Sequence, residues 1–171
     1  LSVTAESPLV GMAVGEAEAQ RDAPLLLALL SGNEARLAPP ADQMIWVGTV
    51  LGVLGKRDEV AEWAEIVNLR VLPGMRNFGD MFNPGRAGIA EAVVPPASRY
   101  VGQKVGDLRL RKRSNISVLA INRGKKIFRD DIRQVQVRTG DTLVFHGFWK
   151  DLAQAAGDRD FVVVTDYPKD E

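Results

Sequence analysis

The chain has 171 residues, 46% of them hydrophobic, and its 22 basic and 22 acidic residues give a net charge of zero. This composition is typical of a folded globular protein, and the balanced charge excludes a strong overall attraction to nucleic acid. The chain has no cysteine, which excludes disulfides and thiolate metal sites, and no run approaches the roughly 20 apolar residues that span a membrane.

The first 72 residues predict a small α+β unit, because apolar runs alternate with turn sequences such as Ser31-Gly32-Asn33. The expected strands are 1–5, 25–30, 44–47, 50–54 and 66–72. One short helical stretch is expected around Val10, Val14 and Ala17, and a longer helix is expected at 56–64. The predicted order of elements is therefore β-α-β-β-β-α-β.

Residues 73–86 contain Pro-Gly, Phe-Gly-Asp and Asn-Pro-Gly and show no hydrophobic period, which predicts a linker. Residues 87–171 then predict a second unit of the same plan. Its expected strands are 89–94, 116–122, 135–137, 142–145 and 161–165, with a turn at 123–126 that leads into Ile127-Phe128. Its expected helices are one from an N-cap at Ser98 to Leu108 and one at 148–156. In each unit we expect a mostly antiparallel sheet with two helices.

The two units carry the same motif. Residues 7–16 and 98–107 both read Ser-x-x-Val-Gly-x-x-Val-Gly-acid, an offset of 91, and matches such as Gly48 with Gly140 continue at an offset of 92. A repeat of this length is a whole small domain rather than one unit of a solenoid. Two such copies predict a pair related by pseudo-twofold symmetry, with a seam that offers a place for a ligand or partner.

Catalytic chemistry has little support in this sequence. His146 is the only histidine, placed at the end of a predicted strand, and no serine stands in a nucleophile-elbow pattern. One histidine without cysteine leaves only carboxylates as metal ligands, and these lack calcium-loop spacing. We therefore expect a protein that is not an enzyme and that holds no metal and no cofactor.

Polar residues at strand ends of the second unit are the candidate ligand contacts: Asn122, Arg123, Arg138 and His146. Arg123 follows a buried strand, where a guanidinium can bind phosphate or carboxylate through two parallel hydrogen bonds. An exposed turn arginine is the alternative. The first unit has Leu30-Ser31-Gly32 at this place, so the candidate site is not duplicated. The basic cluster 109–113 is equally compatible with a solvated helix end.

Three segments of the second unit resemble the RCK C-terminal (TrkA-C) domain: 94–111, 118–124 and 137–147. The acid-Leu-Ala of the last helix, Asp151-Leu152-Ala153, fits the same pattern. The first unit is similar but lacks the Arg-Gly turn and has Gly48-Thr49 in place of the Gly-Asp pair. The resemblance therefore implies tandem TrkA-C domains: a degenerate copy at 1–72 and an intact copy at 87–171.

In that family the domain regulates potassium channels and transporters from the cytoplasmic face, often dimerises, and in some members binds small ligands, including cyclic di-AMP. Tandem copies resemble the soluble insert of divalent anion/sodium symporter permeases. The resemblance implies a ligand-sensing module on the cytoplasmic side of the inner membrane, excised from a longer bacterial transporter. Its expected partners are the membrane domain, a second copy in a homodimer, and a small anionic or nucleotide effector, but no nucleic acid. The alternative is an architectural dimerisation module without a ligand.

Overall fold

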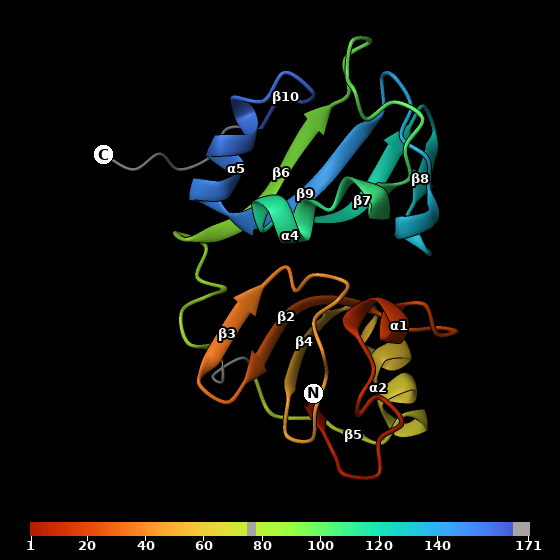
Figure 1. The fold of residues 1–171 in the computed structure, drawn as a ribbon, viewed down its shortest axis with the longest axis vertical. Coiled ribbons are helices and arrows are strands. Elements are labelled where there is room, and N and C mark those ends of the chain that lie inside the picture. The colour runs from red at the N-terminus through yellow and green to blue at the C-terminus, as the bar shows by residue number, and fades with distance from the viewer. Residues whose placement is uncertain (75–77, 166–171) are drawn as a thin grey trace. The chain divides into compact units, whose positions relative to one another are not determined.

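A computed structural model of the chain describes residues 1–74 and 78–165. The chain divides into two compact units, Leu1–Phe82 and Asn83–Glu171, which are described separately. Each unit is a mixed α+β structure built on one five-stranded antiparallel sheet, as the sequence predicts (Figure 1). Among the described residues, no helix has the length and apolar character to cross a membrane.

The first unit has the element order β-α-β-β-β-α-β, which matches the predicted order although β3 takes the place of the strand predicted at 44–47. Its strands lie side by side in the order β3-β2-β4-β1-β5. The elements are β1 (Ser2–Val3), α1 (Val14–Glu18), β2 (Leu25–Ser31), β3 (Glu34–Leu37), β4 (Val50–Leu54), α2 (Arg57–Ile66) and β5 (Leu69–Arg70).

The sheet of the first unit is covered on both faces. Leu29 and Leu51 point into a core that contains Trp63 of α2. On the opposite face Gly52 pairs with Ala28, and a Cβ at Gly52 would lie only 3.3 Å from the ring of Phe78. Phe78 is buried, so the segment after β5 closes this face of the sheet. Burial on both faces explains why β2 is an almost continuous run of leucines.

Two strands predicted from apolar runs, 44–47 and 135–137, are not strands of either sheet. Met44 and Gln136 form only isolated bridges, to Ala13 and Lys104. The backbone groups of these two segments instead form hydrogen bonds with the loop before the first helix of their own unit, so the segments are not part of the sheet. The sequence prediction missed β3, whose residues Glu-Ala-Arg-Leu are too polar for a buried strand but suit the edge position that β3 occupies.

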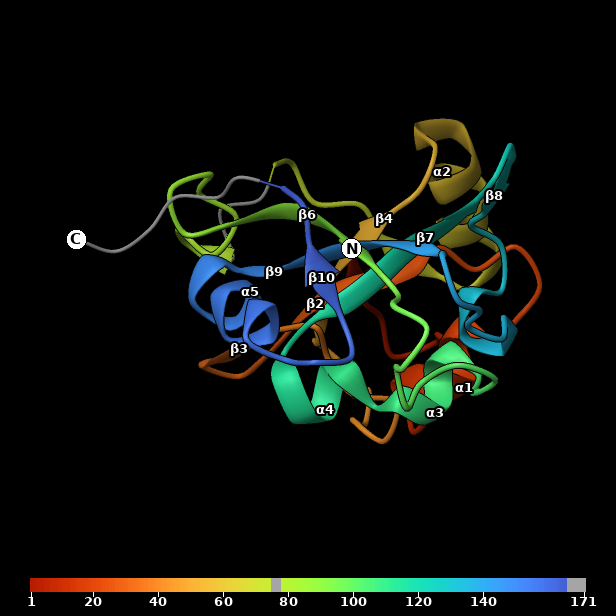
Figure 2. The same ribbon diagram turned by 90° about the horizontal axis from the view of Figure 1, so that it is seen from above.

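The second unit has its strands in the order β10-β6-β9-β7-β8. The helix α5 lies beside β9, and the short helices α3 and α4 follow one another along the chain (Figure 2). The elements are β6 (Ala87–Val93), α3 (Val105–Leu108), α4 (Leu110–Ser114), β7 (Ser117–Arg123), β8 (Lys126–Phe128), the 3₁₀ helix η2 (Ile132–Gln134), β9 (Thr142–Phe148), α5 (Trp149–Ala156) and β10 (Val162–Val163).

The predicted helix from Ser98 to Leu108 begins later than expected. Ser98 does accept a backbone hydrogen bond at 3.2 Å, but from Tyr100 N within a turn rather than at a helix start. Gly102 lies between this turn and α3 and has a positive φ of 88°, so the chain is not helical at this residue. The helical region therefore contains two short pieces, α3 and α4, separated by Arg109 in the left-handed conformation.

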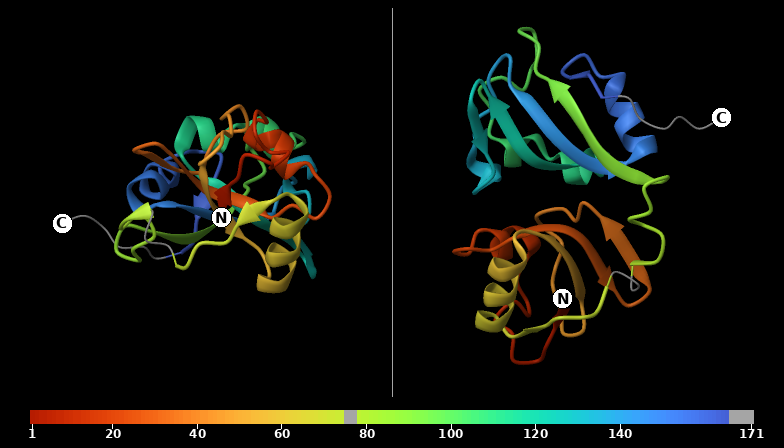
Figure 3. Two further views of the ribbon diagram at one scale, coloured as in Figure 1. Left: turned by 90° about the horizontal axis from the view of Figure 1, so that it is seen from below. Right: turned by 180° about the vertical axis from the view of Figure 1, so that it is seen from behind.

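The repeated motif has one structural meaning in both units. Gly11 N donates to Ile45 O at 2.8 Å, and its counterpart Gly102 N donates to Val137 O at 2.7 Å. Both glycines have a positive φ near 85°, at 84° and 88°. The strand orders also correspond when β1–β5 are matched with β6–β10 (Figure 3). The sequence repeat is thus a repeat of topology and of the loop that precedes the first helix.

Candidate functional site

Arg123 and Asp141 form the polar centre of the second unit. The carboxylate oxygens of Asp141 accept bonds from Arg123 Nε and from one terminal guanidinium nitrogen, each at 2.8 Å. The Asp141 side chain is fully buried, and the Arg123 side chain is 24% exposed. This two-bonded geometry is the strong form of an arginine–carboxylate pair. The hydrogen bonds that the Arg123 guanidinium donates to Asp141 raise its pKa.

The same carboxylate fixes the turn that carries Arg138. Arg138 N donates to Asp141 Oδ2 at 2.8 Å, and Asp141 N donates back to Arg138 O at 3.1 Å. Arg123 also donates to Gln136 O at 2.8 Å and lies 4.8 Å above the centre of the Phe128 ring. Arg123 therefore binds a carboxylate of the chain itself, with Asp141 as the acceptor.

The structure brings three of the four predicted site residues to one end of the sheet. Asn122 pairs with Thr142 at the start of β9, and Arg138 is exposed in the turn just before that strand. Arg123 joins this turn to β7 through its bonds to Asp141. We call the group Asn122, Arg123 and Arg138 the turn cluster.

His146 lies elsewhere, and its predicted position at a strand end is wrong. The strand β9 continues to Phe148, and His146 is buried between Ile89 of β6 and Ser117 of β7. At about 3.4 Å per residue, the four steps from Thr142 to His146 separate it from the turn cluster by roughly 14 Å. Burial lowers the pKa of the His146 imidazole, which favours its neutral form near pH 7.

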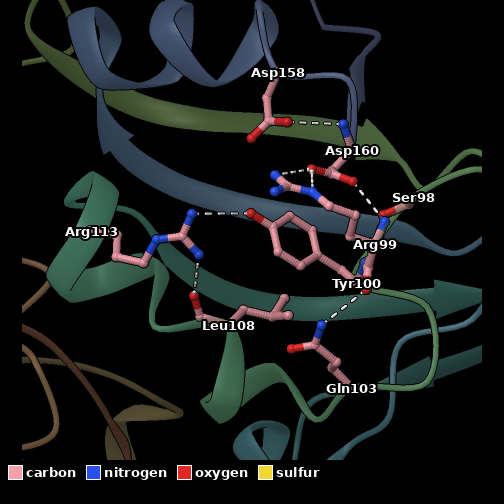
Figure 4. Close-up of polar contacts among 8 residues, drawn as sticks. All are labelled: Ser98, Arg99, Tyr100, Gln103, Leu108, Arg113, Asp158 and Asp160. Carbon is pink, nitrogen blue, oxygen red and sulfur yellow. Dashed lines mark hydrogen bonds and ion pairs between the residues drawn. The ribbon is translucent and has the colours of Figure 1, made fainter.

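A second ion pair, which the sequence analysis did not predict, joins Arg99 to Asp160 (Figure 4). Asp160 accepts three hydrogen bonds from Arg99, one from the backbone at 2.7 Å and two from the guanidinium at 3.0 and 2.7 Å. These bonds lower the pKa of Asp160 to about 2. The two residues are 61 positions apart, and neither local sequence indicates the pairing.

Aromatic packing extends this contact into the core. The Tyr100 ring stacks on Phe161 at 5.1 Å between ring centres, and Phe161 meets Phe145 edge-on at 5.2 Å. Arg113 of α4 donates to the Tyr100 hydroxyl at 3.4 Å (Figure 4). The loop before α3, the helix α4 and the segment before β10 are thereby held together in the second unit.

The second unit is thus a small α+β domain in which ion pairs hold loops against the sheet. Among the described residues, no group of three histidine, cysteine, aspartate or glutamate side chains is placed to hold a metal ion. Residues 89–156 match the family model of the TrkA-C domain. The resemblance of the motifs in the second unit to this domain is thus confirmed over residues 89–156.

The chain is 25% identical over 171 residues to the uncharacterized transporter sll0640 of Synechocystis sp.. The match covers 96% of this chain but only 28% of that transporter. The chain thus aligns along almost its whole length with a minor part of a much longer transporter.

Several solved structures are also similar. The RCK C domain of the potassium transport protein KtrA, in complex with cyclic di-AMP, is 21% identical, with a TM-score of 0.36 over 58% of this chain and 94% of that one. S. agalactiae BusR, in complex with its promoter DNA, is 18% identical, with a TM-score of 0.37 over 58% and 45% of the two chains. The GsuK RCK domain is 10% identical, with a TM-score of 0.37 over 86% and 60%.

Proposed function

We propose that this chain is the regulatory segment of a bacterial membrane transporter. One observation carries the proposal: 96% of the chain aligns within a transporter of which it spans only 28%. The TrkA-C domain at 89–156 supports a regulatory role for this segment. In this proposal the segment lies on the cytoplasmic side of the inner membrane, and its partner is the membrane domain of the same protein.

The reading frame that encodes the chain tests this placement directly. Hydrophobic spans of about 20 residues are expected on both sides of the segment. A frame without any such span would overturn the transporter assignment. A second test measures transport by the full-length protein in vesicles. It compares the parent protein with variants that carry substitutions on the interaction surfaces of this segment.

The regulatory mechanism that we propose is ligand sensing. An effector that binds one arrangement of the two units more tightly than another shifts the equilibrium between them, and the membrane domain follows. The turn cluster is the proposed anion contact, because Arg138 is exposed there and Asn122 is only half-buried. A small anion or a nucleotide such as cyclic di-AMP fits the charge of this cluster.

Isothermal titration calorimetry with cyclic di-AMP, ATP and a dicarboxylate tests the sensing mechanism. We expect binding that weakens about tenfold or more in Arg138→Ala, since a hydrogen bond to a charged group is worth roughly 1.5–3 kcal/mol. Arg129→Ala is the matched control, because Arg129 is an exposed arginine outside the turn cluster. Absence of heat with all three ligands would overturn ligand sensing and leave the placement in a transporter standing.

A purely architectural role is the second candidate, and the Arg123 geometry favours it. Its guanidinium is already engaged by Asp141, Gln136 and Phe128, so this arginine fastens a turn. In this alternative the chain forms a homodimer and no small molecule is needed. Analytical ultracentrifugation separates the two roles: a dimer whose dissociation constant is the same with every ligand supports architecture.

A further inference from the structure

The two units carry opposite net charges, although the whole chain is neutral. Residues 1–82 contain six lysines and arginines against eleven aspartates and glutamates, a net charge of −5. Residues 83–171 contain sixteen against eleven, a net charge of +5. Charge separation on this scale creates fields that act on whatever approaches each unit.

The positive charge is concentrated on the helices between β6 and β7 and on η2. Gly106 of α3 lies against Arg133 of η2, with 3.2 Å from a Cβ built at Gly106 to the Arg133 carbonyl oxygen. The short helices α3 and η2 are in contact, and α4 follows α3 directly along the chain. We call the basic residues in and next to these three helices the basic surface: Lys104, Arg109, Arg111, Lys112, Arg113 and Arg133. The exposed carboxylates in the same stretches are Asp107 in α3 and Asp131 before η2, so the basic residues outnumber them six to two.

The negative charge of the first unit is concentrated on α2. Asp58, Glu62 and Glu65 follow at intervals of four and three residues, so they lie on one face of the helix. All three are exposed, and Glu59 adds a fourth exposed carboxylate. The opposite face of α2 carries Trp63, which is buried in the core. At about 1.5 Å per residue the acidic row is roughly 10 Å long.

Neither charged surface is needed to build this fold, because the corresponding helix in the other unit lacks it. At the repeat offset of 91, Lys104 and Arg109 correspond to Ala13 and Glu18 in the first unit. At the offset of 92, Glu62 and Glu65 correspond to Gln154 and Gly157 in the second. The remaining residues of the basic surface have one basic counterpart among four: Gln20 for Arg111, Arg21 for Lys112, Asp22 for Arg113 and, at the offset of 92, Ala41 for Arg133.

We propose that the acidic row of α2 in one copy of the chain binds the basic surface of a second copy. Each copy supplies one surface of each sign, so the same pairing is available in both directions between two copies. The equal and opposite charges of the units favour a second copy over an anionic small molecule, which would leave the acidic row without a role. The inference rests on the homodimer that the proposed function gives in its architectural alternative, and it assigns the surfaces of that dimer.

Charge reversal with mixing tests this pairing by sedimentation velocity on the 171-residue chain. The basic-reversed variant is Lys104→Glu/Arg109→Glu/Arg111→Glu/Lys112→Glu, which makes the net charge of the surface negative, and the acid-reversed variant is Asp58→Lys/Glu62→Lys/Glu65→Lys. We expect each variant alone to be monomeric, with at least a hundredfold weaker association than the parent chain. A one-to-one mixture is expected to form a heterodimer, because each of its two contacts then joins opposite charges again.

The control variant Lys125→Glu/Lys126→Glu reverses two exposed lysines outside the basic surface, one in the turn between β7 and β8 and one at the start of β8, and is expected to stay dimeric. Raising sodium chloride from about 0.05 M to about 0.5 M is expected to weaken the parent dimer at least tenfold, since the Debye length falls from about 14 to about 4 Å. Melting curves verify that every variant is folded.

Three results would overturn the pairing. The first is a parent chain that stays monomeric at about 100 μM, well above the roughly micromolar dissociation constants of modest interfaces. The second is a dimer that survives either reversal, which leaves the dimer of the proposed function intact but places it on other surfaces. The third is a pair of folded monomeric variants that do not associate on mixing. Binding of the parent monomer to phosphatidylglycerol vesicles through the basic surface, without dimerisation, would assign that surface to lipid instead.

Discussion

The two units build the same turn with different chemistry. Thr49 and Asp141 occupy corresponding positions, both are buried, and the side chain of each accepts a bond from the backbone three residues earlier, at 3.1 Å from Trp46 N and 2.8 Å from Arg138 N. Only Asp141 also binds an arginine, because the counterpart of Arg123 is Ser31. The turn therefore needs a buried acceptor, and a hydroxyl is sufficient for that purpose.

A second difference concerns the sheet faces. The first sheet is closed on its outer face by Phe78, whereas the second presents exposed apolar side chains on β6, β8 and β10. These are Ile89, Ile127 and Val162, each more than half exposed. The first unit thus uses its outer face for its own packing, and the second leaves apolar surface there.

The largest expected loss of stability follows from Phe78→Ala, which removes the side chain that closes the outer face of the first sheet. Removing a buried phenylalanine is expected to cost about 3–4 kcal/mol, because it uncovers Gly52 and Ala28 and leaves a cavity. Hydrogen exchange measured by mass spectrometry, resolved by unit, is expected to show faster exchange in residues 1–74 only. Ile127→Ala in the second unit is the control and is expected to cost less than about 1 kcal/mol, since Ile127 is already exposed. Equal effects of the two substitutions would contradict the difference between the faces.

Asp141→Ala comes next, with an expected loss of about 3 kcal/mol in the second unit. The substitution leaves the partly buried Arg123 without its acceptor and the Arg138 amide without its bond. Thr49→Ala in the first unit removes one hydroxyl acceptor and is expected to cost about 1 kcal/mol. Urea denaturation followed by unit-resolved hydrogen exchange measures both losses.

The double substitution Arg123→Ser/Asp141→Thr sharpens the same comparison, since it installs the residues of the first unit. It is expected to recover at least about half of the stability lost in Asp141→Thr alone, because no buried charge is then left unpaired. A double variant as unstable as Asp141→Thr would show that the ion pair has a role that the hydroxyl turn cannot replace.

How far the sequence predicts this fold depends on the kind of signal. The leucine run of β2 is a strong local pattern and predicts a correct strand. The repeated Val-Gly motif correctly predicts that a short helix follows in each unit but places the start of that helix too early. The apolar run at 44–47 misled the prediction, because apolar residues also occur in a loop that packs beside the first helix. The edge strand β3 was missed because its polar residues suit solvent as well as a sheet edge.

The candidate site shows the same limit. Asn122, Arg123 and Arg138 could be grouped from sequence because they adjoin strands that pair with each other. His146 could not be separated from them, since its distance depends on where β9 ends. The Arg99–Asp160 pair depends on a contact over 61 positions that only the folded chain creates.

Acid is expected to weaken the second unit through Asp160. Its folded pKa of about 2 lies below the ordinary value of 3.8, so the carboxylate contributes stability above about pH 4. This contribution is lost as the pH falls from about 4 toward 2, because protonation removes the acceptor for Arg99. The counterpart in the first unit is Asn68, which does not titrate. Urea midpoints measured between pH 5 and pH 2 are expected to fall less in Asp160→Asn than in the parent, by about the Asp160 contribution. Parallel pH profiles would show that Asp160 is not the group responsible.

The smallest expected effect concerns a turn that has the same backbone conformation in both units. Gly48 and Gly140 both have a φ of 83°, and no heavy atom lies within 4 Å of a Cβ built at either position. Alanine at either site is therefore expected to add backbone strain without a clash, at a cost of about 1–2 kcal/mol. The two losses are expected to agree within about 0.5 kcal/mol, because the conformation and surroundings match. A markedly larger loss at Gly140 would mean that the Arg123–Asp141 pair makes its turn more rigid than the corresponding turn of the first unit, and the hydroxyl would then be only a partial substitute for the ion pair.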